Sequence, residues 1–256
     1  MEKYTLITGA TSGLGKELSY IYASNKNNLF LVSRNEKELS SLQNEIINKY
    51  SVEVKILAID LSVVEDYSKI TDFIKANNMF INNLVNNAGF GDRCDFIDMD
   101  IEKQIQMTNV NCNAPLYLIH ELLKDMLKNN EGHIINISSI AGFIPGPYMV
   151  TYHATKGYLL LLGEGIEREL KGTNVHLLTV CPGPFESNFV KKAHNDYTFS
   201  KIKPVSARKI AEITYKNSIK NKRLVIVGLK NKLTIFITRF FSRHFVTCSS
   251  AKTIKK

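Results

Sequence analysis

The sequence predicts an α/β protein in which helices cover both faces of a parallel sheet. Short apolar runs, bounded by Gly, Asn, Asp or Ser, alternate with longer amphipathic runs, as expected for strands joined by crossover helices. Because such crossovers are right-handed, the strands should form one doubly wound, Rossmann-type sheet. The chain has 256 residues and 44% hydrophobic content, which is enough for a single domain of this kind.

Seven apolar runs are expected to form the strands, at residues 4–8, 29–32, 54–58, 84–85, 133–137, 175–180 and 224–227. The helices are expected near 13–24, 35–50, 63–77, 101–128, 151–171 and 206–219, with Gly172 as a candidate C-terminal cap. The sequence therefore predicts one seven-stranded Rossmann-fold domain over residues 1–228. A basic, amphipathic C-terminal extension over residues 229–256 should follow it.

The basic charge of the chain is concentrated in its C-terminal fifth. The net charge is +9, yet residues 201–256 alone carry fifteen Lys and Arg residues and a single acid, Glu212. Nucleic-acid binding would require these charges among stacking aromatic groups or on a recognition helix. An ordinary solvated helix face accounts equally well for Lys201, Lys203, Arg208, Lys209, Lys216 and Lys220, so no nucleic-acid partner is expected.

Neither the N-terminus nor the cysteines indicate a secreted protein. Residues 1–4 lead directly into a strand, without the basic and apolar regions of a signal peptide, and no uncharged apolar run reaches 18 residues. We therefore expect a cytoplasmic protein that is at most peripheral to a membrane. We also expect buried thiols in a reducing compartment and no metal site, because no Cys-x-x-Cys pair and no nearby His occurs among Cys94, Cys112, Cys181 and Cys248.

A glycine-rich turn follows the first expected strand. Residues 8–15 read Thr-Gly-Ala-Thr-Ser-Gly-Leu-Gly, in which Gly9, Gly13 and Gly15 permit a sharp turn and a close approach of the backbone to a ligand. The helix beginning near Gly13 would direct its positive end at a pyrophosphate. The spacing departs from G-x-G-x-x-G, but the position between a strand and a helix favours a dinucleotide site.

Tyr152 and Lys156 stand four residues apart in an expected helix, so their side chains should share one face. A nearby ammonium group favours the phenolate and is expected to lower the tyrosine pKa from its usual value of about 10. A proton donor with such a pKa suits the reduction of a carbonyl group.

Several further motifs occur in the order typical of the short-chain dehydrogenase/reductase family, which the chain resembles over nearly its whole length. They are Asp60-Leu61, Asn86-Asn87-Ala88-Gly89, Val110-Asn111-x-x-Ala114, Ile137-Ser138-Ser139 and Pro182-Gly183, each near the end of an expected strand or in the following helix. The Asn-rich motif, followed by Phe90-Gly91 and later by Asp95-Phe96, resembles bacterial NADP-linked oxidoreductases more than the 3-oxoacyl-carrier-protein reductases.

The resemblance implies a catalytic set of Asn111, Ser139, Tyr152 and Lys156. Ser139 would hold the substrate oxygen, Tyr152 would give the proton, and Lys156 would bind the ribose hydroxyls of the cofactor. Asn111 would hold a water that links Lys156 to solvent. The implied cofactor-binding residues are Gly9, Thr11, Ser12, Gly13, Leu14, Gly15, Arg34, Asp60, Leu61, Asn87, Ala88, Gly89, Tyr152, Lys156, Pro182, Gly183 and Ser187.

The end of the second expected strand should select the dinucleotide. An acid at this point binds the ribose 2′-hydroxyl of NAD, whereas an arginine receives the 2′-phosphate of NADP. Here Ser33 takes the place of the acid and Arg34 follows it, so the sequence predicts NADP(H) as the cofactor. Ser12 stands where many NADP enzymes carry a basic residue.

The predicted function is the NADP(H)-dependent interconversion of a carbonyl and a secondary alcohol on an apolar small molecule. The pocket should lie between residues 90–91, 142–150 and a substrate loop over about 183–204, which supply Phe90, Phe143, Ile144, Tyr148, Met149, Phe185, Phe189 and Phe199. A membrane-associated lipid or acyl-chain ketoreductase is an alternative. A catalytically silent NADPH-binding regulator is a second alternative, against which the intact catalytic set argues.

Two surfaces indicate contacts beyond the core. The helix over 151–171 is apolar almost all round, so it should be buried on more than one face. The resemblance implies that it pairs in a homo-oligomer, a dimer or tetramer.

The tail stripe of Leu229, Leu233, Phe236, Ile237 and Phe240 is bordered by Lys230, Lys232, Arg239 and Arg243. It could cap the pocket or a subunit neighbour, or contact an anionic membrane. Packing on the protein is expected.

Overall fold

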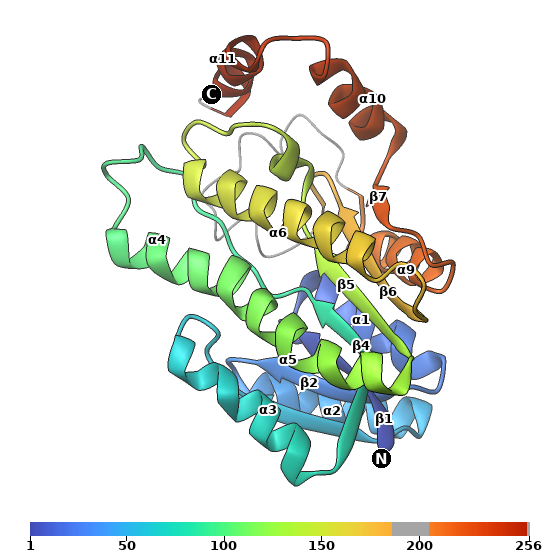
Figure 1. Ribbon diagram of the computed structural model, residues 1–256. Helices are drawn as coiled ribbons and strands as arrows, with labels where there is room; N and C mark the ends of the chain where they lie inside the picture. The colour runs from blue at the N-terminus through green and yellow to red at the C-terminus, as the bar shows by residue number, and fades with distance from the viewer. Residues whose placement is uncertain (186–204, 255–256) are drawn as a thin grey trace.

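The computed structural model describes residues 1–185 and 205–254 and confirms the predicted α/β fold (Figure 1). All seven strands are parallel and follow the order β3-β2-β1-β4-β5-β6-β7. The strands are β1 (Glu2–Thr8), β2 (Asn28–Ser33), β3 (Val54–Ala58), β4 (Met79–Asn86), β5 (Gly132–Ile137), β6 (Val175–Cys181) and β7 (Leu224–Ile226). Since β1 lies between β2 and β4, the order of the sheet reverses there, and this is the point where open α/β sheets bind ligands.

The helices lie close to their predicted positions. They are α1 (Gly13–Ser24), α2 (Glu36–Tyr50), α3 (Tyr67–Ala76), α4 (Ile101–Thr108), α5 (Ala114–Asn129), α6 (Val150–Glu169), α9 (Ala207–Ser218), α10 (Leu229–Thr238) and α11 (Arg243–Ile254), with 3₁₀ turns at Val64–Asp66 and Ile140–Phe143. Among the strands, the one predicted at residues 84–85 was too short, because β4 begins at Met79. Gly172 adopts a φ of +96°, although it lies beyond the last turn of α6.

The alternation of side chains along the strands builds two apolar layers. Ile7, Leu29 and Leu31 face α1, α2 and α9 on one side of the sheet. Leu6 and Phe30 face α3, α5 and α6 on the other side. Because successive residues of a strand point to opposite faces, these continuous apolar runs bury both faces of the sheet.

The helix predicted over 101–128 is interrupted by one wide π turn at Asn109–Asn113. Pro115 follows this turn in the first residues of α5, and its ring nitrogen has no hydrogen to donate to the carbonyl of Asn111. A π turn inserts one extra residue into the helix and changes the direction of its side chains. The interruption therefore sets the direction of the Asn111 side chain.

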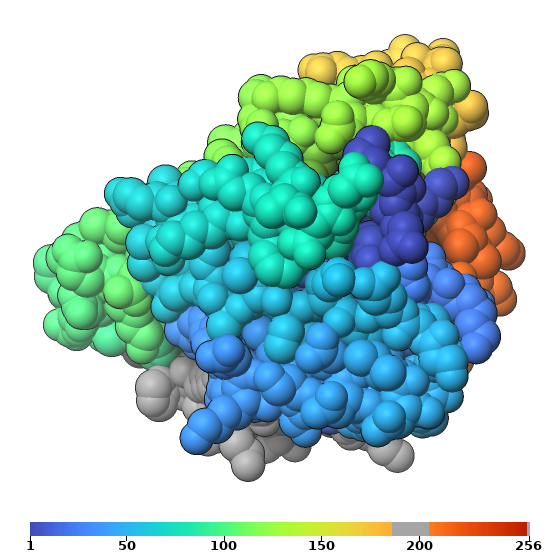
Figure 2. Space-filling view, turned by 90° about the horizontal axis from the view of Figure 1, so that it is seen from below, coloured from blue at the N-terminus to red at the C-terminus, as the bar shows by residue number. Residues whose placement is uncertain are grey.

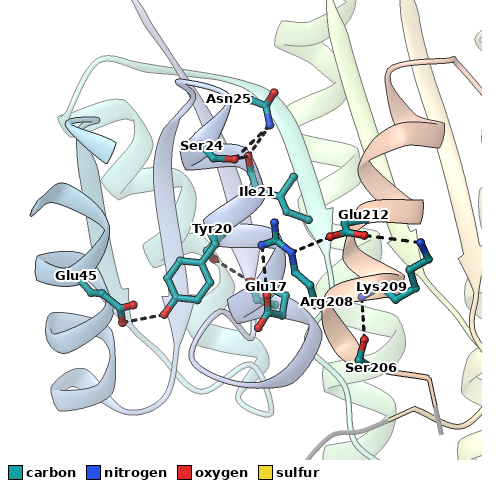
Figure 3. Close-up of polar contacts among 12 residues, drawn as sticks. Glu17, Tyr20, Ile21, Ser24, Asn25, Glu45, Ser206, Arg208, Lys209 and Glu212 are labelled. Carbon is teal, nitrogen blue, oxygen red and sulfur yellow. Dashed lines mark hydrogen bonds and ion pairs between the residues drawn. The ribbon is translucent and has the colours of Figure 1, made fainter. Parts of the chain in front are cut away.

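Helix α9 is fastened to α1 by both apolar and ionic contacts. The rings of Tyr22 and Tyr215 meet edge to face with centroids 5.1 Å apart. Arg208 of α9 lies between Glu17 of α1, at 3.5 Å, and Glu212, at 3.0 Å (Figure 3). Exposed ion pairs of this kind each contribute at most about 1 kcal/mol, so burial of the rings stabilises this contact more than the charges do.

The tail forms two helices at the end of the molecule where the strands terminate. In Figure 1, α10 and α11 arch over that end in dark red, and the dark red is absent from the opposite face in Figure 2. The stripe expected to pack on the protein is largely solvent-exposed, with exposed fractions of 82% for Leu229, 58% for Leu233, 55% for Phe236 and 74% for Phe240. Within one chain these four residues therefore do not pack on the protein as expected, whereas Ile237 of the same stripe lines the cavity at this end of the molecule and Ile235 packs inward.

One other expectation about burial also needs correction, that for the cysteines. Cys112 and Cys181 are buried as expected, but Cys94 is half-buried and Cys248 is exposed in α11. In α6, Leu159 and Leu160 are buried, whereas Leu161 is 69% exposed. A run of four leucines covers more than one helix face, so within a monomer only part of it can contact the sheet.

Two glycines of α6 provide a direct test of the contact between this helix and the sheet. A Cβ added at Gly163 would lie 2.2 Å from Oγ1 of Thr179 in β6, whereas one at Gly165 would meet nothing within 4 Å. We predict that Gly163→Ala lowers the free energy of unfolding by about 1–3 kcal/mol through overpacking. Gly165→Ala should raise it by about 0.5–1 kcal/mol, since alanine is the better helix former. Urea denaturation measures both, and equal effects would contradict the close contact.

Candidate functional site

A single cavity of about 1500 Å³ lies at the carboxyl ends of the strands, where the order of the sheet reverses. The predicted residues that line it are Gly9, Thr11, Ser12, Gly13, Leu14, Arg34, Asp60, Leu61, Asn87, Ala88, Gly89, Ser139, Tyr152, Lys156, Pro182 and Gly183. Gly15 and Asn111 do not line this cavity, and Ser187 lies outside the described residues. The sheet thus brings together motifs that are up to about 170 residues apart in the chain.

The glycine-rich turn forms a cradle at one end of this cavity. Gly9 and Gly13 have φ values of +65° and +52°, a region that favours glycine. A Cβ added at Gly15 would lie 2.2 Å from the carbonyl oxygen of Gly9, so the third glycine permits the turn to close. Helix α1 starts at Gly13 and has no acid in its first turn, so its free N–H groups can receive a phosphate.

The Asn-rich motif after β4 braces this turn. The Asn87 side chain donates to the carbonyl oxygens of Thr8, at 2.9 Å, and Gly9, at 3.2 Å. In return, the Thr8 hydroxyl accepts hydrogen bonds from the backbone N–H groups of Asn87, at 3.1 Å, and Ala88, at 3.0 Å. These four bonds join the ends of β1 and β4 and hold the cradle in place.

The predicted catalytic side chains meet at the other end of the cavity. A hydrogen bond joins the side chains of Ser139 and Tyr152. Lys156, on the same face of α6, has its Nζ 5.8 Å from the centroid of the Tyr152 ring. That ammonium group donates to the carbonyl oxygen of Ile137 at 2.9 Å, and Ser138 donates to the carbonyl oxygen of Lys156 at 2.7 Å. These two bonds tie the carboxyl end of β5 to the first half of α6 beside the site.

Asn111 lies behind these residues and is fully buried. Its side-chain amide donates to the carbonyl oxygen of Phe90, at 2.9 Å, and to the hydroxyl of Thr155, at 3.0 Å, while its oxygen accepts from the N–H of Phe90 at 3.1 Å. Thr155 in turn donates to the carbonyl oxygen of Tyr152 at 2.8 Å. Asn111 therefore fixes both the loop after Gly89 and the helix that carries Tyr152.

Burial shifts the pKa values of both Tyr152 and Lys156. It raises the pKa of Tyr152 to about 12, although the hydrogen bond with Ser139 acts in the opposite direction. It also lowers the pKa of Lys156 to about 8. The expected lowering of the Tyr152 pKa by Lys156 is not found in the protein alone, where removing water from the phenolate raises that pKa.

The adenosine end of the cavity combines hydroxyl groups with basic side chains. The hydroxyls of Thr11 and Ser33 are 2.9 Å apart, and Nη1 of Arg34 lies 3.9 Å from Oδ2 of Asp60. Arg34 is 69% exposed, so this pair is loose and leaves the guanidinium group accessible. Lys37 also lines the cavity, and it was missed because its place in the first turn of α2 resembles an ordinary surface lysine.

The substrate region agrees in part with the prediction. Phe90, Ile144, Met149 and Phe185 line the cavity, whereas Phe143 and Tyr148 do not. Phe189 and Phe199 lie outside the described residues.

The cavity is also lined by residues that were not predicted. One is His153, whose Nδ1 lies 2.9 Å from the carbonyl oxygen of Ile144. The tail closes one wall through Thr234, Ile237, Thr238, Phe241, Phe245, Val246, Ser249, Ser250, Thr253 and Ile254.

These features fit a nicotinamide dinucleotide. The glycine cradle, the hydroxyl and basic groups at one end and the Tyr152–Lys156 face at the other lie along one continuous cavity. An added Cβ at Gly89 would lie 3.0 Å from Oδ1 of Asn111 and 3.2 Å from Nζ of Lys156. A bare glycine at this point leaves room for a ligand to reach the lysine.

Comparison with known proteins agrees with this description. A family model described as short chain dehydrogenase matches residues 3–198. An uncharacterised oxidoreductase of Staphylococcus epidermidis is 30% identical over 82% of this chain and 88% of its own. A very-long-chain 3-oxoacyl-CoA reductase of Anas platyrhynchos is 33% identical over 70% of this chain and 58% of its own. A solved short-chain dehydrogenase from Sphingobium yanoikuyae, in complex with NADPH, has a TM-score of 0.84 at 23% identity, covering 94% of each chain.

The family model covers more than half of the chain, and most of the residues predicted for the site line one cavity. The chain therefore belongs to the short-chain dehydrogenase/reductase family of oxidoreductases.

Proposed function

We propose that this oxidoreductase interconverts a carbonyl and a secondary alcohol on an apolar small molecule, with NADP(H) as cofactor and Tyr152 as the acid or base. The observation that carries the proposal is the meeting of Ser139, Tyr152 and Lys156 at one end of a cavity whose other end is the glycine cradle. Intact catalytic side chains argue against a silent NADPH-binding regulator.

The chemistry follows from the positions of the side chains. The nicotinamide ring, when bound, supplies or accepts hydride. Ser139 would donate a hydrogen bond to the substrate oxygen, and Tyr152 would transfer its proton to the same oxygen. Since its pKa is raised to about 12, Tyr152 is protonated at neutral pH, the form that carbonyl reduction requires. Lys156 would bind the ribose hydroxyls of the cofactor. Asn111 would hold the water that links Lys156 to solvent.

The preference for NADP(H) rests on the adenosine end of the cavity. Ser33 takes the place of an acid, and Arg34 and Lys37 both line the cavity there. A guanidinium group can bind a phosphate through two parallel hydrogen bonds. The solved relative from Sphingobium yanoikuyae binds NADPH, in agreement with this preference.

An acyl-chain ketone is a second candidate substrate. The similarity to a very-long-chain 3-oxoacyl-CoA reductase and the apolar wall formed by Ile237, Phe241 and Phe245 both favour it. A panel of apolar ketones and 3-oxoacyl thioesters, assayed with NADPH, would distinguish these substrates.

The first test concerns the proton donor. We predict that Tyr152→Phe lowers kcat by at least about a thousandfold, because the phenyl ring keeps its packing but has no proton to transfer. Tyr158→Phe, on the same helix and 38% exposed, is the matched control and should leave kcat unchanged. NADPH oxidation with the best ketone of the panel measures both. A Tyr152→Phe enzyme within about threefold of the original would refute the assignment.

The second test concerns the cofactor. The unmodified protein should bind NADPH more tightly than NADH by about 2 kcal/mol, or roughly thirtyfold, because Arg34 gains a charge-assisted contact with the phosphate. Arg34→Asp should reverse this preference, whereas Lys128→Asp, at the far end of α5, should not. Calorimetric titration measures the affinities, and equal binding of both nucleotides by the unmodified protein would contradict the role of Arg34.

The third test concerns assembly. The exposed Leu161 and Tyr158 on α6 support a homo-oligomer, since burying them in a second subunit would stabilise the pair. Sedimentation should therefore give a mass that is a multiple of the 29.0 kDa monomer, and Leu161→Lys should reduce it to one chain. A monomer at micromolar concentration, or an oligomer unaffected by Leu161→Lys, would argue against this interface.

A further inference from the structure

Helix α10 presents an apolar face to solvent. Leu229, Leu233 and Phe236 recur every three or four residues along it and are 82%, 58% and 55% exposed. Residues at this spacing lie on one side of a helix. Phe240, two residues after the helix ends, is 74% exposed, and its ring meets that of Phe236 at 5.3 Å. These four residues are called the tail patch below, and exposed apolar clusters of this kind mark sites of interaction.

The opposite face of α10 is fixed to the protein. Ile235 is 4% exposed, and the side chain of Asn231 donates to the carbonyl oxygen of Val227 at 2.6 Å. A Cβ added at Gly183 would lie 2.4 Å from Nδ2 of Asn231, so this glycine allows α10 to approach the cavity wall. The tail patch therefore has a defined direction and faces away from the core.

Basic side chains surround the tail patch. Along the helix, Lys230 falls on one flank, Lys232 and Arg239 fall on the other, and Arg243 begins α11. No acid follows Glu212 in the sequence. The surface thus combines an apolar strip with positive charge on both sides, which is the pattern of a helix that lies in the interface of an anionic bilayer.

The tail patch is continuous with the mouth of the cavity. Ile237, Phe241 and Phe245 line the cavity and are also 43%, 49% and 54% exposed, so they form part of its rim. Figure 1 shows α10 and α11 together at the end of the molecule where the strands terminate. An apolar molecule leaving a bilayer at this surface would meet the cavity directly.

We propose that the tail patch and its flanking basic residues dock the protein on the surface of an anionic lipid bilayer, with the mouth of the cavity facing the lipid. None of the helices within residues 1–185 and 205–254 is both long and apolar enough to cross a bilayer. The proposal concerns binding alone and does not depend on which substrate is reduced.

Charge and packing favour lipid over other partners. If two copies of the chain met symmetrically at this patch, Lys230, Lys232 and Arg239 of one copy would face the same three cations of the other copy. The tail has no acid that could pair with them. Single-stranded nucleic acid would stack on aromatic faces. The two rings of the patch, Phe236 and Phe240, meet edge to face at 5.3 Å, and its other half, Leu229 and Leu233, is aliphatic and offers no stacking face.

Flotation of the full-length protein with lipid vesicles tests the proposal. The protein should float with vesicles that contain phosphatidylglycerol, and binding to vesicles of phosphatidylcholine alone should be weaker by at least about tenfold. Binding should fall sharply in about 1 M salt, where the screening length is about 3 Å. Bound cofactor is not required, so the result is independent of the catalytic assignment.

Two sets of variants separate the apolar from the ionic contribution. Replacing the four tail-patch residues by Gln should weaken vesicle binding more than about tenfold. The matched control replaces three other exposed isoleucines and should not weaken binding. It combines Ile97→Gln, Ile101→Gln and Ile105→Gln, at positions that are 87%, 63% and 45% exposed. Lys230→Gln, Lys232→Gln and Arg239→Gln together should weaken binding on the order of a hundredfold. Lys75→Gln, Lys128→Gln and Lys171→Gln remove the same charge elsewhere and control for non-specific attraction.

Melting temperatures and NADPH affinity should be unchanged in all of these variants, since the substituted side chains are exposed. The proposal is overturned if the unmodified protein does not float with anionic vesicles at low salt, or if the tail-patch variant floats equally well. It is also overturned if the tail-patch substitutions instead abolish self-association or the binding of a single-stranded oligonucleotide while flotation is unchanged.

Discussion

The hydrogen bonds between the ends of β1 and β4 are the constraint on which the site depends. Thr8 and Asn87 satisfy each other's polar groups at the point where the order of the sheet reverses. Without these bonds, several backbone groups would be left unpaired in a largely buried place, at a cost of about 1–3 kcal/mol each. The same bonds hold Gly9 in its left-handed conformation and so determine where the first N–H groups of α1 point.

The end of the cavity that holds Tyr152 and Lys156 is supported in the same way, by polar groups that are buried and paired. Asn111, Thr155 and the backbone of Tyr152 form one chain of hydrogen bonds, and the π turn before Pro115 directs Asn111 into it. Because Lys156 is almost completely buried, its charged form is destabilised. Its ammonium group donates to the carbonyl oxygen of Ile137 and also lines the cavity. The rigid support and the altered ionisation thus have a common cause, which is exclusion of water from this end of the sheet.

The tail connects the site to the surface of the molecule. On its inner side Ile235 and Ile254 are buried, and Ile254 also lines the cavity. Its outer side carries exposed apolar and basic residues. A short helix with two apolar sides is unstable in water unless both are covered. The protein covers the inner side itself, and a lipid surface is the proposed cover for the outer side.

The sequence alone was sufficient to predict the parallel α/β architecture, the positions of the main helices and strands, and most of the predicted site residues that line the cavity. These properties depend on local patterns: the period of apolar residues, the glycines of a turn, and the four-residue spacing of Tyr152 and Lys156. Only the tertiary structure decided the ionisation of Tyr152, the break in the helix at Asn109–Asn113, the contribution of Lys37 and His153 to the cavity, and the direction of the tail. Each of these depends on how much water and which neighbours surround a side chain, and burial is set by contacts between segments far apart in the sequence.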